Sequence, residues 1–275
     1  MNLYLNLPSY GTIPVVNSKN QTPNSNVLTQ ITSTTSPFIT KANGNITIRQ
    51  SFWQPVPNVI RYTYKYLGNN QFQRLHTDPH SNLITNSNFP DTVFSNSVTY
   101  SGRLIGLILE SPHEEEYHSI LTSMIPIAPA QSQNATGGVI DREIEKLLEI
   151  FSLQQVAIPK TFQTDEIIHI VILNPIPYQT SLFHIHQRAL KGTYCTLRNN
   201  VWKCIWNIPN VRSDFHSVLN RFSSNDILIN CCTSQLQPIL HTWLQNLPHT
   251  SAPHLLKGHH PSTLKMKGRW YQTIN

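Results

Sequence analysis

RLIGLILE, at residues 103–110, is a short apolar run that ends directly in a polar motif. Two further runs have the same form: IIHIVILN at residues 167–174 and DILINCC at residues 226–232. Short, continuous apolar runs of this kind are typical of strands that are buried on both faces, as in parallel sheets. The sequence therefore predicts a central sheet of short parallel strands.

Helical patterns alternate with these runs. DREIEKLLEIFSL, at residues 141–153, has apolar residues at helical spacing behind an aspartate, and residues 213–222 and 234–247 show similar patterns. Strand, loop and helix in repetition indicate an α/β domain with three αβα layers, which we expect over residues 97–275. Ligands of such sheets bind beyond the carboxyl ends of the strands, so the segments that follow the strands are where functional residues are expected.

The first 96 residues are dense in Asn, Ser, Thr and Pro, and their acidic residues are Asp78 and Asp91. We expect no long helices there, and loop or extended structure from residue 9 to residue 44. RYTYKYLGNNQFQRLHT, at residues 61–77, alternates around a Gly-Asn-Asn turn as a β-hairpin does. Residues 1–96 are therefore predicted to be a polar N-terminal extension or a small β subdomain.

Composition favours a globular protein with an anionic partner. The chain has 275 residues, of which 39% are hydrophobic, and a formal net charge of +6. Residues 188–275 carry ten Lys and Arg residues against two Asp residues, which fits either a phosphate-facing surface or a merely solvated basic face. The start lacks a signal-peptide pattern and no apolar run reaches the ~18 residues of a membrane span. We expect a soluble, cytoplasmic monomer that does not enter a membrane.

Three segments, each at or after an expected strand, resemble motifs of the uracil-DNA glycosylase superfamily. HPSTL, at residues 260–264, is similar to the HPSPL signature of that superfamily at four of five positions. LESPH, at residues 109–113, resembles the first motif, which reads GQDPY in one branch and GEAPG in the iron–sulfur branch. Asn174 closes its strand as the base-reading asparagine does. The similarity covers roughly residues 103–270 as motifs in the same order.

The resemblance implies a uracil-DNA glycosylase-like fold and a monofunctional DNA glycosylase that hydrolyses the N-glycosidic bond of a flipped-out pyrimidine, leaving an abasic site. His260 would donate a hydrogen bond to the base as negative charge develops on it, helped by the backbone N–H groups of Glu110 and Ser111. Asn174 would read the base, since a carboxamide offers a donor and an acceptor side by side. The alternative for Asn174 is a strand-end turn before Pro175.

The same resemblance assigns roles in DNA binding. Leu264 would be the apolar wedge that enters the vacated base stack, although core packing is the commoner role of a leucine. The loops that would hold DNA phosphates contain Pro112, Pro261, Ser262 and Lys265. The prolines could equally be ordinary turn residues.

The sequence departs from the family pattern at the water-activating position. Ser111 stands where the GQDPY branch carries Asp, and a serine cannot act as a carboxylate base. Glu110 therefore becomes the candidate to orient water, with the acidic residues 114–116 as rivals.

The walls of the base pocket also depart from the pattern. His113 replaces the tyrosine that screens the C5 side of the base, and residues 135–137 lack the expected stacking aromatic. A wider pocket makes a bulkier pyrimidine, such as a hypermodified cytosine of phage DNA, an alternative to uracil. The excised base, the strand preference and a role in repair or in phage defence stay open.

The four cysteines, Cys195, Cys204, Cys231 and Cys232, form no CxxC pair, and none precedes the first motif. We therefore expect no iron–sulfur cluster, no metal and no other cofactor. Two other readings stay open. One is a catalytically weak DNA-binding or damage-sensing module on the same fold, and the other is a metal-dependent hydrolase that uses the HIH and GHH stretches, which lack HExxH spacing.

Overall fold

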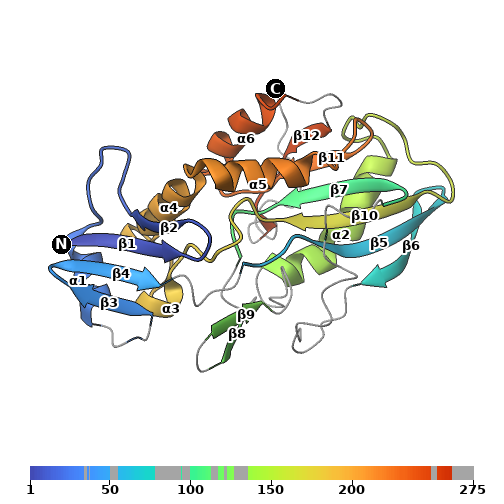
Figure 1. The fold of residues 1–275 in the computed structure, drawn as a ribbon. Coiled ribbons are helices and arrows are strands. Elements are labelled where there is room, and N and C mark those ends of the chain that lie inside the picture. The colour runs from blue at the N-terminus through green and yellow to red at the C-terminus, as the bar shows by residue number, and fades with distance from the viewer. Residues whose placement is uncertain are drawn as a thin grey trace. The chain divides into compact units, whose positions relative to one another are not determined.

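The computed structural model describes residues 1–33, 36, 38–49, 55–77, 94, 100–112, 117–120, 123–126, 136–248 and 253–261. The strands are β1 (Asn2–Leu7), β2 (Gly11–Pro14), β3 (Ile39–Ala42), β4 (Asn45–Arg49), β5 (Val59–Gly68), β6 (Gln71–Thr77), β7 (Arg103–Ile108), β8 (Tyr117–Ile120), β9 (Ser123–Pro126), β10 (Ile167–Leu173), β11 (Ile227–Asn230) and β12 (His254–Lys257) (Figure 1). The helices are α1 (Ser25–Ser33), α2 (Thr136–Ser152), α3 (Phe183–His186), α4 (Thr193–Trp206), α5 (Pro209–Leu219) and α6 (Gln237–Gln245).

The chain divides into two compact units. The first unit comprises Met1–Val56, Ser111–Pro126 and Pro175–Phe215, and the second comprises Pro57–Glu110, Ile127–Asn174 and His216–Asn275. The units are thus interleaved along the chain rather than divided at residue 96. The strands of residues 59–77, which we expected in an N-terminal extension, belong to the second unit.

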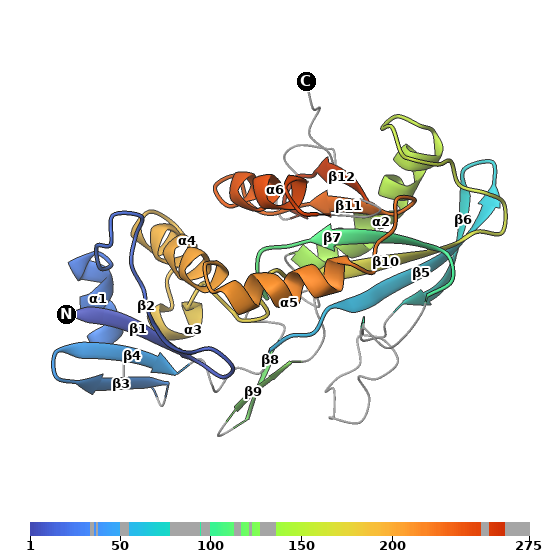
Figure 2. The ribbon, with the colours of Figure 1, turned by 45° about the horizontal axis from the view of Figure 1, so that its top comes forward.

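The second unit contains a six-stranded sheet in the order β12-β11-β7-β10-β5-β6 (Figure 2). β12, β11, β7 and β10 run parallel to one another, and β5 and β6 extend the sheet in antiparallel fashion. The strands predicted at residues 103–110, 167–174 and 226–232 are confirmed as β7, β10 and β11. Their continuous apolar character has the expected cause, because all six residues of β7 and all four of β11 are buried.

One face of this sheet packs against α2. Ile105, Leu107 and Ile170 join Ile144 and Leu148 of α2 in one buried cluster. These helix positions are four residues apart and so lie on one side of the helix. The helix predicted at residues 141–153 is confirmed, with an earlier start.

The other face is approached by α6. A Cβ atom at Gly106 would lie 2.7 Å from Leu228 and 2.8 Å from Leu173, so this face of β7 is too crowded for any side chain. Asn230 shares a face with Leu228 because strand residues alternate, and its amide donates to the carbonyl oxygen of Gln237 in α6 at 3.0 Å. The second unit is therefore a mixed α/β structure with a mostly parallel sheet flanked by helices, compatible with three layers.

The predicted hairpin at residues 61–77 is confirmed as β5 and β6. Asn69 and Asn70 both have positive φ, 49° and 60°, as the tight turn between two strands requires. Its unexpected feature is the pairing of β5 with β10 over Ile167–Ile172. Arg74 of β6 ties the hairpin to α2 through an ion pair with Glu145 at 3.0 Å.

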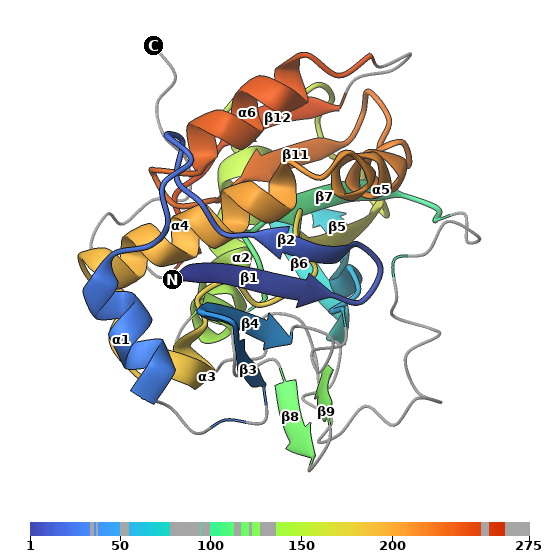
Figure 3. The same cartoon turned by 60° about the vertical axis from the view of Figure 1, so that its left-hand side comes forward.

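The first unit is built on a four-stranded sheet in the order β2-β1-β4-β3. β1 and β4 are parallel, with Leu3 beside Ile46 and Leu5 beside Ile48, all four buried. The helices α1, α3 and α4 lie close to one another beside this sheet (Figure 3). The region is therefore folded around a core of its own.

The helix α1 was not expected in the segment of residues 9–44. Val27, Leu28 and Ile31 are buried on one side of it, and the side chain of Asn24 accepts a hydrogen bond from the N–H of Asn26 at 2.8 Å. The high content of Ser, Thr and Asn concealed this pattern. The burial of three aliphatic side chains outweighs the weak helix propensity of the polar residues.

Candidate functional site

The candidate site lies at the carboxyl edge, by which we mean the residues that directly follow β7, β10, β11 and β12 in the second unit. Ile108 pairs with both Leu173 and Asn230, so three of these strands end level with one another. Because all four strands are parallel, Glu110, Asn174 and His260 emerge at the same edge of one sheet.

Asn174 is the most unusual residue of the carboxyl edge. It is only 4% exposed, and neither Oδ1 nor Nδ2 of its side chain has a hydrogen-bond partner in the described part of the chain. Its backbone N–H donates to Oδ1 of Asn58 at 2.9 Å, which fixes the residue at the end of β10. An unpaired buried donor or acceptor costs roughly 1–3 kcal/mol. A ligand that supplies an acceptor and a donor would remove this cost.

Glu110 is 5% exposed and links two loops of the edge. Its Oε1 accepts a hydrogen bond from the N–H of Thr233 at 2.6 Å, which joins the segment after β7 to the segment after β11. The Cys232 thiol donates to the carbonyl oxygen of Leu109 at 3.3 Å and strengthens the same link. Glu110 therefore has a structural role in addition to any role in catalysis.

Gln237, the first residue of α6, fastens the ends of β11 and β12 together. Its side-chain amide donates to the carbonyl oxygens of Asn230 at 2.8 Å and of Gly258 at 2.6 Å. The N–H of Gly258 donates in turn to the carbonyl oxygen of Asn230 at 3.0 Å. These bonds fix the segment that leads into His259 and His260, of which His259 is buried and His260 half-buried.

The strand order sets the separation across the carboxyl edge. β10 and β12 are separated by β7 and β11. With a spacing of about 4.8 Å between neighbouring strands, the axes of β10 and β12 lie about 14 Å apart. For one base to contact both Asn174 and His260, their side chains and the segment after β12 must therefore reach over the ends of β7 and β11.

Some of the other predicted site residues are described by the structure, and the rest lie outside the described residues. Ser111 and Pro112 belong to the first unit, where the Ser111 hydroxyl lies 2.8 Å from the hydroxyl of Thr180. Pro261 is buried directly after His260. The residues His113, Ser262, Leu264 and Lys265 lie outside the described residues, as do the acidic residues 114–116.

Several of the basic residues that suggested an anionic partner take part in internal packing. Arg221 lies over the rings of Phe94 and Tyr100, at 5.0 and 5.2 Å from their centroids. Arg212 donates to the carbonyl oxygen of Trp206 at 2.7 Å. The surplus of positive charge in residues 188–275 is therefore only partly directed to solvent.

The histidine-rich stretches do not form a metal site in the described part of the chain, where no group of three or more His, Cys, Asp or Glu residues is arranged to hold an ion. In the HIH stretch, the ring nitrogens of His184 are buried, and burial lowers the pKa of His184 to about 3. The Nε2 atom of His186 lies 2.9 Å from the carbonyl oxygen of Ser181. Both histidines thus serve the packing of the first unit.

Two residues of the candidate site were not singled out from the sequence. Asn58 precedes β5 and positions Asn174, and Gln237 joins two strand ends. Pro238 marks the start of a helix, but no local pattern indicates that the residue before it bonds to Gly258, 21 positions away.

No helix in the described residues has the length and apolar character needed to cross a bilayer. The described cysteines are free thiols, and burial raises the pKa of Cys231 to about 12. No protein-family model, curated protein or solved structure matches this chain.

Proposed function

We propose that the chain is a DNA glycosylase that hydrolyses the N-glycosidic bond of a flipped-out pyrimidine. The observation that carries the proposal is the buried carboxamide of Asn174 at the carboxyl end of a parallel strand, which has no hydrogen-bond partner among the described residues. A pyrimidine presents a carbonyl oxygen and an N–H or amino group side by side, and a carboxamide matches that pair. The motif resemblance independently assigns the same residue to base reading.

In this proposal the C1′–N bond of the nucleotide breaks, and its electron pair passes to the base. His260 donates a hydrogen bond to the base carbonyl oxygen, where the negative charge collects. A water molecule adds to C1′ and releases a proton to solvent, and the departed base anion takes up a proton from solvent, which leaves an abasic site and the neutral free base. Glu110 orients that water or offsets the positive charge on the sugar.

A second candidate is a DNA-binding or damage-sensing module with little catalytic power. One observation favours it: the buried carboxylate of Glu110 accepts a short hydrogen bond from the N–H of Thr233. A carboxylate held in this way is less available to activate water. In this alternative the carboxyl edge binds a base without cleaving its bond.

Base release from defined DNA tests both candidates. Uracil-containing, unmodified and hypermodified phage DNA, each single- and double-stranded, are incubated with the protein, and released bases and alkali-labile sites are measured. The variants are Asn174→Ala and His260→Ala, with the exposed Asn225→Ala as matched control. The glycosylase proposal predicts release that Asn225→Ala retains and the two edge variants lose.

Binding to the same DNA separates the alternatives. Retained binding without release from any substrate favours the module. Absence of both release and binding refutes both candidates.

A further inference from the structure

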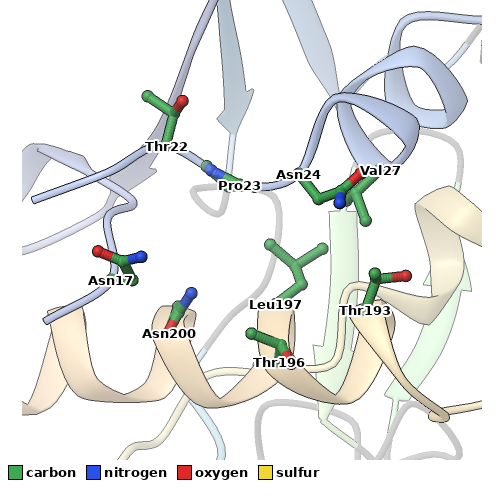
Figure 4. Close-up of a pocket in the computed structure, with 9 residues that line it drawn as sticks. All are labelled: Asn17, Thr22, Pro23, Asn24, Val27, Thr193, Thr196, Leu197 and Asn200. Carbon is green, nitrogen blue, oxygen red and sulfur yellow. The ribbon is translucent and has the colours of Figure 1, made fainter. Parts of the chain in front are cut away.

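The first unit contains a cavity of about 310 Å³ between the segment of residues 17–27 and one side of α4 (Figure 4). Its apolar part is formed by the buried residues Pro23, Val27 and Leu197. The polar lining residues are Asn17, Thr22, Asn24, Thr193, Thr196 and Asn200. Its volume falls at the lower end of the range of small-molecule sites.

The helix α4 presents one continuous side to this cavity. Thr193, Thr196, Leu197 and Asn200 lie at helical spacing, and Figure 4 shows them along the helix opposite Thr22 and Asn24. The hydroxyls of Thr193 and Thr196 lie in the first turn of α4, and the apolar side chain of Leu197 and the carboxamide of Asn200 follow them. A ligand would thus meet polar and apolar contacts in turn.

Part of the polar lining shapes the cavity, and part is available to a ligand. Asn17 is engaged by its own loop, because its Oδ1 accepts from the N–H groups of Lys19 and Gln21. Oδ1 of Asn24 accepts from the N–H of Asn26, which leaves its amino group as a donor. For Thr193 and Asn200 the described residues provide no side-chain hydrogen-bond partner, so both keep donor and acceptor capacity.

The side chains that line the cavity indicate which class of ligand it can bind. None of the nine described residues that line the cavity is charged or aromatic. A charged ligand would lose hydration without gaining a side-chain counter-charge, and a nucleobase would find no ring on which to stack. Hydroxyl and carboxamide groups above an aliphatic floor match a molecule with several hydroxyl groups and apolar C–H faces.

We propose that this cavity is a binding site for a neutral, polyhydroxylated small molecule of the saccharide class. The proposal does not depend on the glycosylase activity, since all nine lining residues belong to the first unit. It assigns ligand contacts to Asn200, Thr193 and Asn24 above the apolar floor.

Ligand-observed saturation-transfer NMR on the full chain tests the proposal. The probes are glucose, N-acetylglucosamine and maltose, with glucose 6-phosphate as the charged probe, because the first turns of α1 and α4 adjoin the cavity and a helix N-terminus can favour an anion. Thr196→Phe, at an exposed position that lines the cavity, fills it. Asn210→Phe, at an exposed position of α5 in the same unit, is the matched control.

The expected result is binding of at least one neutral saccharide, with an affinity that Asn210→Phe retains and that Thr196→Phe lowers about tenfold or more, equivalent to about 1.4 kcal/mol. Circular dichroism and thermal unfolding establish that both variants are folded. Absence of signal from every neutral saccharide overturns the proposal. So does a signal that survives in Thr196→Phe, or tighter binding of glucose 6-phosphate than of glucose.

Discussion

Replacement of Asn174 by leucine should stabilise the protein, although a buried polar residue is lost. The side chain is 4% exposed and both of its polar atoms lack a partner in the described residues. Removing two unpaired groups, each costing roughly 1–3 kcal/mol, should outweigh the imperfect fit of leucine, which costs below about 1.5 kcal/mol. We expect the free energy of unfolding to rise by about 1–3 kcal/mol, together with loss of base release.

Urea unfolding measures this change, and Asn230→Leu is the matched control in the same sheet. Asn230 is fully buried, and its side chain donates to Gln237 at 3.0 Å and accepts from the N–H of Cys232 at 3.2 Å. Leucine there leaves two buried partners unpaired, so the free energy of unfolding should fall by about 2 kcal/mol or more. In a thermal scan, the Asn174→Leu gain corresponds to a midpoint about 2–5 °C higher for a chain of this length.

The sign of the change in the free energy of unfolding tells whether the side chain of Asn174 has partners within the fold. If Asn174→Leu destabilises the protein as Asn230→Leu does, then Asn174 is satisfied within the fold. The reasoning that assigns it to a ligand would then be refuted.

Four further predictions concern other parts of the molecule. Burial lowers the pKa of His184 to about 3, below its unfolded value of about 6.5. The stability due to the neutral form of His184 is therefore complete above pH 6.5 and decreases as the pH falls, with about 2 kcal/mol lost by pH 5. In His184→Leu, urea titrations should show that the free energy of unfolding depends less on pH. Gln237→Leu should lower the free energy of unfolding by about 1–3 kcal/mol, because the carbonyl oxygen of Gly258 loses a donor and that of Asn230 keeps only the N–H of Gly258, and unchanged urea midpoints would contradict this. If the glycosylase proposal holds, His260→Ala should reduce the single-turnover rate of base release about 10²–10³-fold with DNA affinity unchanged, whereas a parallel loss of affinity would indicate a binding role. Base release should also continue in EDTA, and inhibition that added Zn²⁺ reverses would point to a metal-dependent reaction instead.

The sequence predicted the parallel strands well, for a physical reason. Residues such as Ile105, Ile170 and Ile229 are buried because the strands have neighbours and helices on both sides, and such burial leaves a continuous apolar run. The hairpin was equally visible, since Asn69 and Asn70 are the residue type that tolerates positive φ. Both signals, the turn residues and the continuous apolar runs, lie within short segments of the sequence.

The assembly of these elements could not be predicted in the same way. Pairing of β5 with β10 brings Tyr64 beside Ile168, and no local pattern specifies partners so far apart. The same holds for the bond from Gln237 to Gly258. At the candidate site, the sequence indicated Asn174 and Glu110 through motifs. The bond of Glu110 to Thr233, and the lack of a partner for the Asn174 side chain among the described residues, depend on segments far apart in the sequence, which no motif specifies.

The interleaving of the two units restricts how the chain can fold during synthesis and how it can be divided into fragments. β12 is contributed by residues 254–257 and lies at the far edge of a sheet whose other strands come from residues 59–230. During synthesis β12 cannot join the sheet until the chain has left the ribosome beyond residue 257, and a chain that stops before residue 254 would lack both β12 and His260. Neither unit is one continuous segment of the chain, so neither can be expressed as a single fragment. The roles of the two units should therefore be tested by point substitutions instead of deletions.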